Sequence, residues 1–199
     1  MAVIELTELY PHLLPELNGC PKPLVLSKIR DVLIHFFEQT QAWTEEIDRI
    51  PLVADIDTYD LDAPSLGRIE TIKLVTLNGV ELVPYEDYVM PSKGEITLIN
   101  TPVADSAATD DGLEVEVVMK PRRDSTQISK CIYEDHYQTW VHGVLSKLQM
   151  MSKKAWTDLN SAKYHDMEYW DGIAKARVDQ NRLNLAGPLR AQPRVDWLQ

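Results

Sequence analysis

Apolar residues in the first fifty positions recur at the spacing of one helical face. After the stretch "NGCPKP" they stand three and four residues apart, at Val25, Ile29, Val32, Leu33, Phe36 and Phe37. This period of 3.6 residues predicts a long amphipathic helix. Pro23 suits its first turn, because proline has a fixed φ and no N–H to satisfy. We expect the helix to end near Trp43, ahead of the Ile50-Pro51 step, which disfavours helical geometry.

Beyond residue 50 the pattern becomes that of strands. Asn78-Gly79 separates two β-favouring runs in "IKLVTLNGVELVP", which is typical of a type I′ hairpin. The runs "GEITLIN" and "GLEVEVVMK" predict two further strands. In the second run apolar residues alternate with Glu114 and Glu116, so one face of that strand is expected to be buried and the other exposed.

The helical period returns after residue 121. One stripe consists of Tyr133, Tyr137, Trp140, Val141, Val144, Leu148 and Met151. A break at "SKKAW" precedes a final helix of roughly 25 residues, expected from about Thr157. This helix carries two apolar flanks: Ala162, Tyr169, Ile173 and Ala176 on one, and Met167, Trp170, Ala174 and Val178 on the other. Packing within one subunit needs a single stripe, so a second flank indicates a second neighbour, such as another chain.

The last residues, "AGPLRAQPRVDWLQ", contain two prolines and a glycine that exclude regular structure. Apolar side chains there are costly to leave in water, and tryptophan is enriched at interface hot spots. We therefore expect an extended tail that docks on a partner through Arg190, Arg194 and Trp197.

Together these patterns predict an α+β protein. An antiparallel helical bundle, made of the N-terminal helices plus two long C-terminal helices, carries an inserted antiparallel β domain and an extended C-terminal tail. The expected ranges are 1–50 for the N-terminal helices, 51–120 for the β domain, 121–185 for the C-terminal helices and 186–199 for the tail.

Charge divides the 199-residue chain unevenly. The net charge of −11 breaks down as −4 over residues 1–50, −10 over residues 51–120 and +3 over the remainder. An acidic middle repels phosphate backbones, so sequence-specific duplex binding through that region is not expected. No run of 18 uninterrupted apolar residues occurs, and the N-terminus lacks the basic start of a secretory signal, so neither a membrane span nor export is expected.

Candidate chemistry along the chain is sparse. Cys20 precedes a helix, where a thiolate would be stabilised, but no base or orienting group stands nearby, so we interpret it as part of a turn. His136 and His142 fall on opposite sides of a helix, and His165 with Glu168 forms no recognised metal motif. Phosphate-binding glycine loops are also missing from the sequence. No catalytic, cofactor or metal site is therefore predicted, although a carboxylate pair for glycoside hydrolysis is not excluded by counting acids.

The whole arrangement resembles the head-to-tail adaptor proteins of short-tailed bacteriophages, of the tail tubular protein A class. The resemblance rests on "LPELNGCPKPLVLSKIRDVLIHFFEQTQAW", on a β insert that opens "YDLDAP" and contains "LNGVELVP", and on the helices from "VEVVMKPRRDSTQIS" onward. In that family a helix with a small central residue, here Gly143, leads through a tryptophan-containing break to a long final helix. The similarity runs from about residue 10 to residue 185 and is one of architecture.

The resemblance implies a non-enzymatic virion protein, made in the host cytoplasm. It implies a ring, expected to be a dodecamer, that joins the portal protein to the tail tube or nozzle protein and lines the conduit for DNA. The expected partner-binding residues are Trp170, Ile173, Val178, Arg190, Arg194 and Trp197, with the tail docked on the portal. Two alternatives stay open: a tail-associated cell-wall hydrolase, and a monomeric cellular binding module.

Overall fold

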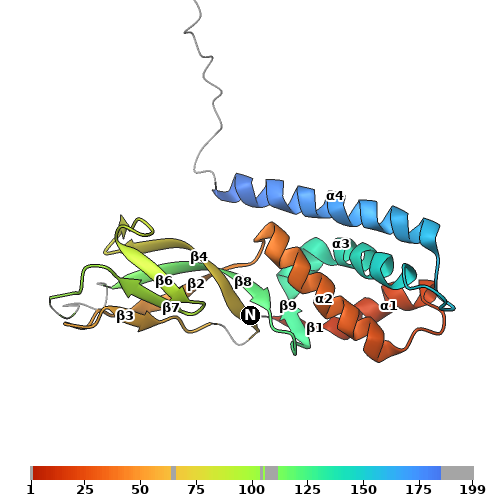
Figure 1. The fold of residues 1–199 in the computed structure, drawn as a ribbon, viewed down its shortest axis with the longest axis horizontal. Coiled ribbons are helices and arrows are strands. Elements are labelled where there is room, and N and C mark those ends of the chain that lie inside the picture. The colour runs from red at the N-terminus through yellow and green to blue at the C-terminus, as the bar shows by residue number, and fades with distance from the viewer. Residues whose placement is uncertain (1, 64–65, 104, 106–111, 185–199) are drawn as a thin grey trace, which may run out of the picture.

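A computed structural model describes residues 2–63, 66–103, 105 and 112–184. It is an α+β fold in which a helical part and a β part lie end to end along the long axis (Figure 1). The helices and 3-10 turns are η1 (Leu6–Leu9), α1 (Tyr10–Leu13), η2 (Leu14–Glu16), α2 (Lys22–Thr40), α3 (Lys130–Gln149) and α4 (Leu159–Asn184). The strands are β1 (Val3–Glu5), β2 (Thr44–Ile50), β3 (Thr58–Asp60), β4 (Gly67–Leu77), β5 (Val80–Glu81), β6 (Tyr88–Ser92), β7 (Glu95–Leu98), β8 (Leu113–Pro121) and β9 (Gln127–Ser129).

The helical part is built from both sides of the β insert. α2 packs on α3, and α4 lies across both of them (Figure 1). Its centre is aromatic: the ring of Trp140, fully buried, meets Phe36 at 5.8 Å and Phe37 at 6.0 Å between centroids. The predicted apolar stripes of α2 and α3 therefore face one another and form one core.

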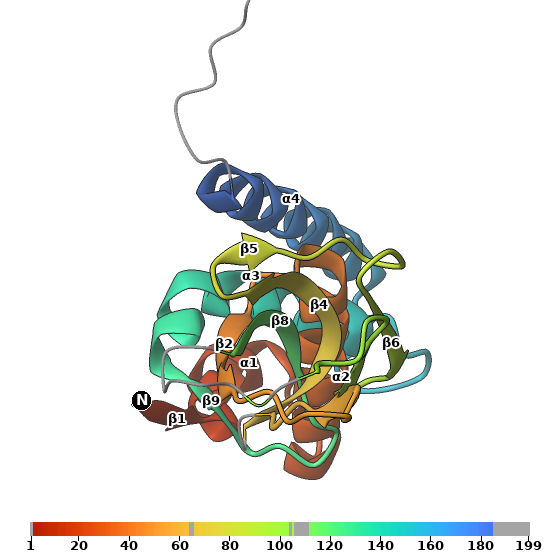
Figure 2. The same cartoon turned by 90° about the vertical axis from the view of Figure 1, so that its left-hand side faces the viewer.

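The β part consists of antiparallel sheets. The larger has the strand order β2-β8-β4-β5 (Figure 2), and a second has the order β3-β7-β6 (Figure 1). β1 and β9 pair separately, with Ile4 opposite Ile128, and so bring the start of the chain to the start of α3. β8, at the centre of the larger sheet, runs directly back into the helical part.

Several sequence predictions are confirmed. Asn78 and Gly79 adopt φ values of 52° and 77° between the paired strands β4 and β5, as a type I′ turn requires. Alternate apolar residues of β8 are buried, while Glu114 and Glu116 are half-exposed. α3 and α4 occupy the predicted ranges, separated by residues 150–158.

Other predictions were wrong. α2 ends at Thr40, short of Trp43, because Gln41 turns left-handed with φ 53° and its N–H caps the Phe37 carbonyl. Residues 44–50, expected with the N-terminal helices, form strand β2 of the larger sheet. Only Ile47 of this edge strand is buried, so it carries no apolar alternation from which a strand could be predicted.

An ion cluster joins the two parts. The Lys120 ammonium, on β8, is almost fully buried and lies 2.5 Å from carboxylate oxygens of Glu38 on α2 and Glu70 on β4. Lys93 reaches Glu70 from the solvent side at 2.7 Å. The Met119 N–H donates to the Trp43 carbonyl at 2.7 Å beside this cluster. The junction is therefore fixed by backbone and charge together.

Cys20 lies in the turn before α2, as interpreted from the sequence. Gly19 has φ +78°, and the Cys20 N–H donates to the Leu17 carbonyl at 2.9 Å. The thiol is 8% exposed, and burial raises its pKa. A raised pKa disfavours the thiolate, which is the opposite of what a nucleophile needs.

Candidate partner-binding surfaces

The inner flank of α4 holds the helix on its own subunit. Ala162, Tyr169, Ile173 and Ala176 are each at most 3% exposed. The Tyr169 hydroxyl reaches the Val32 carbonyl at 3.3 Å and His35 Nδ1 at 2.9 Å. Burial raises the pKa of this phenol well above its usual range. Tyr169 thus stays neutral and fastens α4 to α2.

The outer flank of α4 has no cover within the described chain. Met167 is 56% exposed, Trp170 46% and Val178 47%, and Ala174 is also exposed. The Trp170 ring meets His35 edge-on, with centroids 5.6 Å apart, so the indole is oriented while one face remains open. Large side chains presented in a row are typical of a protein interface.

The C-terminal half of α4 is also pinned to the end of α2. Arg177 Nε donates to the Gln39 carbonyl and its Nη2 to Gln39 Oε1, both at 2.5 Å. Gln180 donates to the Ala42 carbonyl at 3.2 Å. The outer flank is therefore presented on a helix whose position is fixed, which lowers the entropic cost of docking.

The residues predicted to bind partners divide three ways. Trp170 and Val178 lie on the outer flank. Ile173 does not: it is 1% exposed and packs in the core, because it belongs to the flank that faces α2 and α3. Arg190, Arg194 and Trp197 lie outside the described residues.

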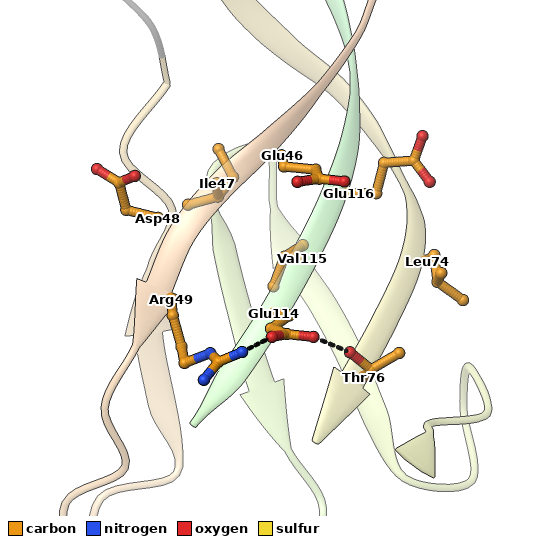
Figure 3. Close-up of a pocket in the computed structure, with 9 residues that line it drawn as sticks. All are labelled: Glu46, Ile47, Asp48, Arg49, Leu74, Thr76, Glu114, Val115 and Glu116. Carbon is orange, nitrogen blue, oxygen red and sulfur yellow. Dashed lines mark hydrogen bonds and ion pairs between the residues drawn. The ribbon is translucent and has the colours of Figure 1, made fainter. Parts of the chain in front are cut away.

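A groove crosses the exposed face of the larger sheet (Figure 3). Acidic side chains dominate its lining, with Glu46 and Asp48 from β2 and Glu114 and Glu116 from β8. Figure 3 shows Arg49, Glu114 and Thr76 in a row across three strands. Arg49 Nη2 donates to Glu114 Oε1, and the Thr76 hydroxyl donates to Glu114 Oε2 at 3.0 Å.

Two of the groove carboxylates have cationic partners. Arg49 binds Glu114, and Lys73 binds Glu116 at 2.6 Å. Glycoside hydrolysis needs one carboxylic acid that holds its proton beside a second that is ionised. Paired with cations on an open sheet face, Glu114 and Glu116 are suited to a solvated acidic surface instead.

A hydrogen-bonded histidine pair links three separate segments, and sequence reasoning missed it. His142 Nδ1 on α3 lies 2.8 Å from His165 Nδ1 on α4, and His165 Nε2 lies 3.1 Å from Glu16 Oε2 on η2. His165 is 6% exposed, so it is a core histidine, and both of its ring nitrogens have hydrogen-bond partners. Among the described residues, no three histidine, cysteine or acidic side chains gather as metal ligands.

We expect this histidine pair to destabilise the fold in mild acid. Burial, reinforced by the neighbouring His165, lowers the pKa of His142 below the ordinary histidine value of about 6.5. A histidine with a depressed pKa stabilises the fold fully above the unfolded value, and that contribution is lost as the pH falls through 6.5 toward the folded pKa. The urea midpoint should therefore drop between pH 7.5 and pH 5.5.

His142→Gln isolates this effect, because it removes the titrating ring while retaining a polar side chain. We expect the midpoint of this variant to change less over the same pH interval than that of the unsubstituted chain. An identical pH dependence in the two proteins would show that other groups control acid stability.

Comparisons with known proteins add a distant structural likeness. The sequence matches no protein-family model and no curated protein. One solved chain with a detectable likeness comes from a structure described as the neck of an empty GTA particle computed with C6 symmetry. It shares 13% identity with this chain at a TM-score of 0.29, over 89% of this chain and 95% of that one.

Within the described residues, each helix is too short or too polar to cross a bilayer.

Proposed function

We propose that this protein is a structural, non-enzymatic subunit of a phage-type virion. In this proposal, copies form a ring that joins the portal vertex to the tail and surrounds the path of the DNA. The observation that carries the proposal is the outer flank of α4, an ordered apolar surface on a helix already packed on its inner side. The adaptor resemblance of the sequence supplies the kind of assembly in which such a flank is covered.

Burial of the outer flank would contribute substantially to assembly. Fully burying a large apolar side chain is worth about 1.5–3 kcal/mol, and Trp170, Met167 and Val178 are each about half exposed. Their burial against a neighbour therefore supplies a few kcal/mol per contact, before the entropic cost of association. Repeated around a closed ring, such contacts are mutually reinforcing.

The acidic charge suits a conduit for DNA. The chain carries −11 overall, and the groove of the larger sheet adds an open acidic face. A surface of the same sign as the phosphate backbone does not retain DNA, so a genome would pass without binding.

The alternatives fit less well. A cell-wall hydrolase needs a protonated acid beside an ionised one, whereas Glu114 and Glu116 are engaged by Arg49 and Lys73. A monomeric binding module leaves the outer flank of α4 uncovered. Oligomeric state separates this second alternative from the ring.

Trp170→Glu tests the proposal. Mass photometry of the full chain, alone and mixed with the portal ring of the same genome, should show several copies per complex for the unsubstituted protein. Trp170→Glu should weaken that association at least about tenfold, since buried tryptophans at interfaces contribute about 2 kcal/mol or more. Its unfolding free energy should fall by about 1 kcal/mol, because nearly half of the indole is already exposed in the isolated chain.

Ile56→Glu is the matched control. The exposed fraction of Ile56 is 44%, similar to the 46% of Trp170, but this residue lies in the β part, before β3. We expect this variant to assemble like the unsubstituted chain. A Trp170→Glu protein that assembles normally would refute the proposed role of the outer flank, and a chain that ignores every portal would refute the ring.

A further inference from the structure

Strand β5 and the loop that leads from it to β6 expose a second apolar surface, far from α4 in sequence. Val80 is 65% exposed, Val83 46% and Tyr85 85%. Tyr85 stands near the apex of this loop and is more exposed than any large side chain of the α4 flank. We call residues 80–87 the tyrosine loop.

Tyr85 is also held in a strained backbone conformation. Its φ is +67°, in the left-handed region that bulky residues avoid. The other described non-glycine residues with positive φ are the polar side chains Gln41, Asp55, Asn78 and Lys153. Strain of this kind persists where the surrounding structure enforces it, and it is concentrated at functional sites.

Hydrogen bonds enforce the conformation of the tyrosine loop. The Val83 N–H donates to Asp87 Oδ2 at 2.8 Å, and the Asp87 N–H returns a bond to the Val83 carbonyl at 2.9 Å. The Tyr85 N–H donates to the Tyr88 carbonyl at 2.8 Å. The ring is thus presented on a preorganised support, so docking it costs little further entropy.

The charges around Tyr85 select a basic partner. Glu81 and Glu86 are exposed on either side of it, and Asp87 is half-buried below. The loop belongs to the segment 51–120, whose net charge is −10. Another acidic surface would be repelled, whereas an arginine both neutralises these carboxylates and stacks on an aromatic ring.

The chain itself has a cavity with an arginine in its lining, as a partner for Tyr85 requires. The connection between β8 and β9 borders a cavity of about 310 Å³, lined by Leu66, Arg122 and Thr126 among others. The cavity is a shallow depression that is open to solvent, so a side chain of another copy can reach it. Arg122 and Asp124 line the cavity, and the next residue, Arg123, is exposed beside them. Glu5 lies at its edge, where it accepts a hydrogen bond from Gln127.

The walls of this arginine cavity are fixed in place. Arg122 Nε donates to the Gly67 carbonyl at 3.0 Å. From α2, Arg30 Nε donates to the Ser125 carbonyl at 2.9 Å and so adds a third cation to the site. Arg122, the adjacent Arg123 and Arg30 outnumber Asp124 and Glu5, so the surroundings of the cavity are basic in an acidic protein.

The tyrosine loop and the arginine cavity lie on opposite sides of the molecule. In Figure 1 the loop that follows β5 is at the upper edge, and the connection between β8 and β9 is at the lower edge. Figure 2 gives the same separation in the perpendicular view. The two surfaces therefore cannot meet within one chain, but they can meet between successive copies.

We propose that Tyr85 of one copy docks in the arginine cavity of the next copy, with Glu86 facing Arg123. This inference rests on the proposed ring and specifies a contact between its neighbouring subunits. The contact joins two different surfaces, so each copy offers a free loop and a free cavity to further copies. Successive contacts of this head-to-tail kind close into a ring when their rotation permits.

Tyr85→Gly tests the contact without endangering the fold. Glycine tolerates positive φ, so the thermal midpoint of the isolated chain should stay the same or rise. Association between copies, measured by mass photometry with the portal ring, should weaken at least about tenfold. Gln41→Gly is the matched control, because it relaxes a φ of 53° without removing an exposed ring, and it should assemble normally.

Exchanging the charges of Glu86 and Arg123 then tests whether Tyr85 docks in the arginine cavity. Glu86→Arg and Arg123→Glu should each weaken assembly, and the double variant should restore it, because the opposite charges face one another again. If Tyr85→Gly and both single variants assemble normally while Trp170→Glu does not, this contact is refuted and the proposed function stands. Failure of the double variant to restore assembly also refutes the cavity as the occupant. An unsubstituted chain that never assembles refutes both.

Discussion

Gly143→Leu is expected to destabilise the protein by about 3 kcal/mol or more, the upper range for overpacking a core. Gly143 lies in the middle of α3, where α2 and α4 both approach. A Cβ atom there would stand 2.7 Å from Tyr169 Cδ2 and 2.8 Å from Val32 Cγ1, inside van der Waals contact. The Tyr169 ring cannot move aside freely, since its hydroxyl is bound to α2. Urea denaturation followed by circular dichroism measures the effect.

Gln138→Leu is the control for a leucine added to α3. Gln138 is exposed on the same helix, so the substitution should change the unfolding free energy by only about 0.5 kcal/mol. Equal stability of Gly143→Leu and Gln138→Leu would show that the three helices can separate without loss. The close approach at Gly143 would then have no role in specifying the fold.

Lys120→Ala is expected to cost about 2 kcal/mol or more by removing the cation from the junction of the two parts. Breaking a buried ion pair typically costs about 3–5 kcal/mol, and the partial exposure of Glu38 and Glu70 lowers that figure. Burial pushes the pKa of Glu70 upward, but Lys120 and Lys93 outweigh it and leave this pKa lowered. Thermal and urea unfolding at several pH values measure the loss.

The pH dependence follows from the lowered pKa of Glu70. A depressed carboxyl pKa stabilises the fold fully above its unfolded value and stops doing so as the pH falls through the folded pKa. The cost of Lys120→Ala should therefore be largest near neutral pH and shrink below about pH 4. Lys93→Ala is the matched control: this lysine is 56% exposed and binds the same carboxylate, so its loss should cost at most about 1 kcal/mol. If both substitutions lowered the unfolding free energy equally, the burial of Lys120 would not explain its contribution to stability.

Elements with strong local signals were predictable from the sequence. α2, α3 and α4 carry long apolar stripes, and the Asn78-Gly79 turn specifies its own backbone conformation. The short strands β1, β3, β6 and β9 were missed, because three to five residues cannot establish a period. Their pairing is decided by distant partners, as for Val3 opposite Ser129.

The candidate surfaces were predictable only in part. The two flanks of α4 follow from its periodicity, yet Ile173 was assigned to a partner when it faces the core. It stands three residues after Trp170, only about 60° away around the helix, so periodicity alone does not resolve the boundary between flanks. The strained backbone of Tyr85 and the pairing of His142 with His165 have no sequence signal, because both depend on tertiary structure.

The division of the helical core between the two ends of the chain has a consequence for biosynthesis. During translation α2 leaves the ribosome long before α3, with Phe36 and Phe37 lacking the Trp140 ring that they contact in the finished fold. The N-terminal strand β1 likewise lacks its pairing strand until β9 has been synthesised. The core therefore cannot complete its folding until the last third of the chain has been made, and until then the nascent chain exposes an apolar helix that is prone to aggregation.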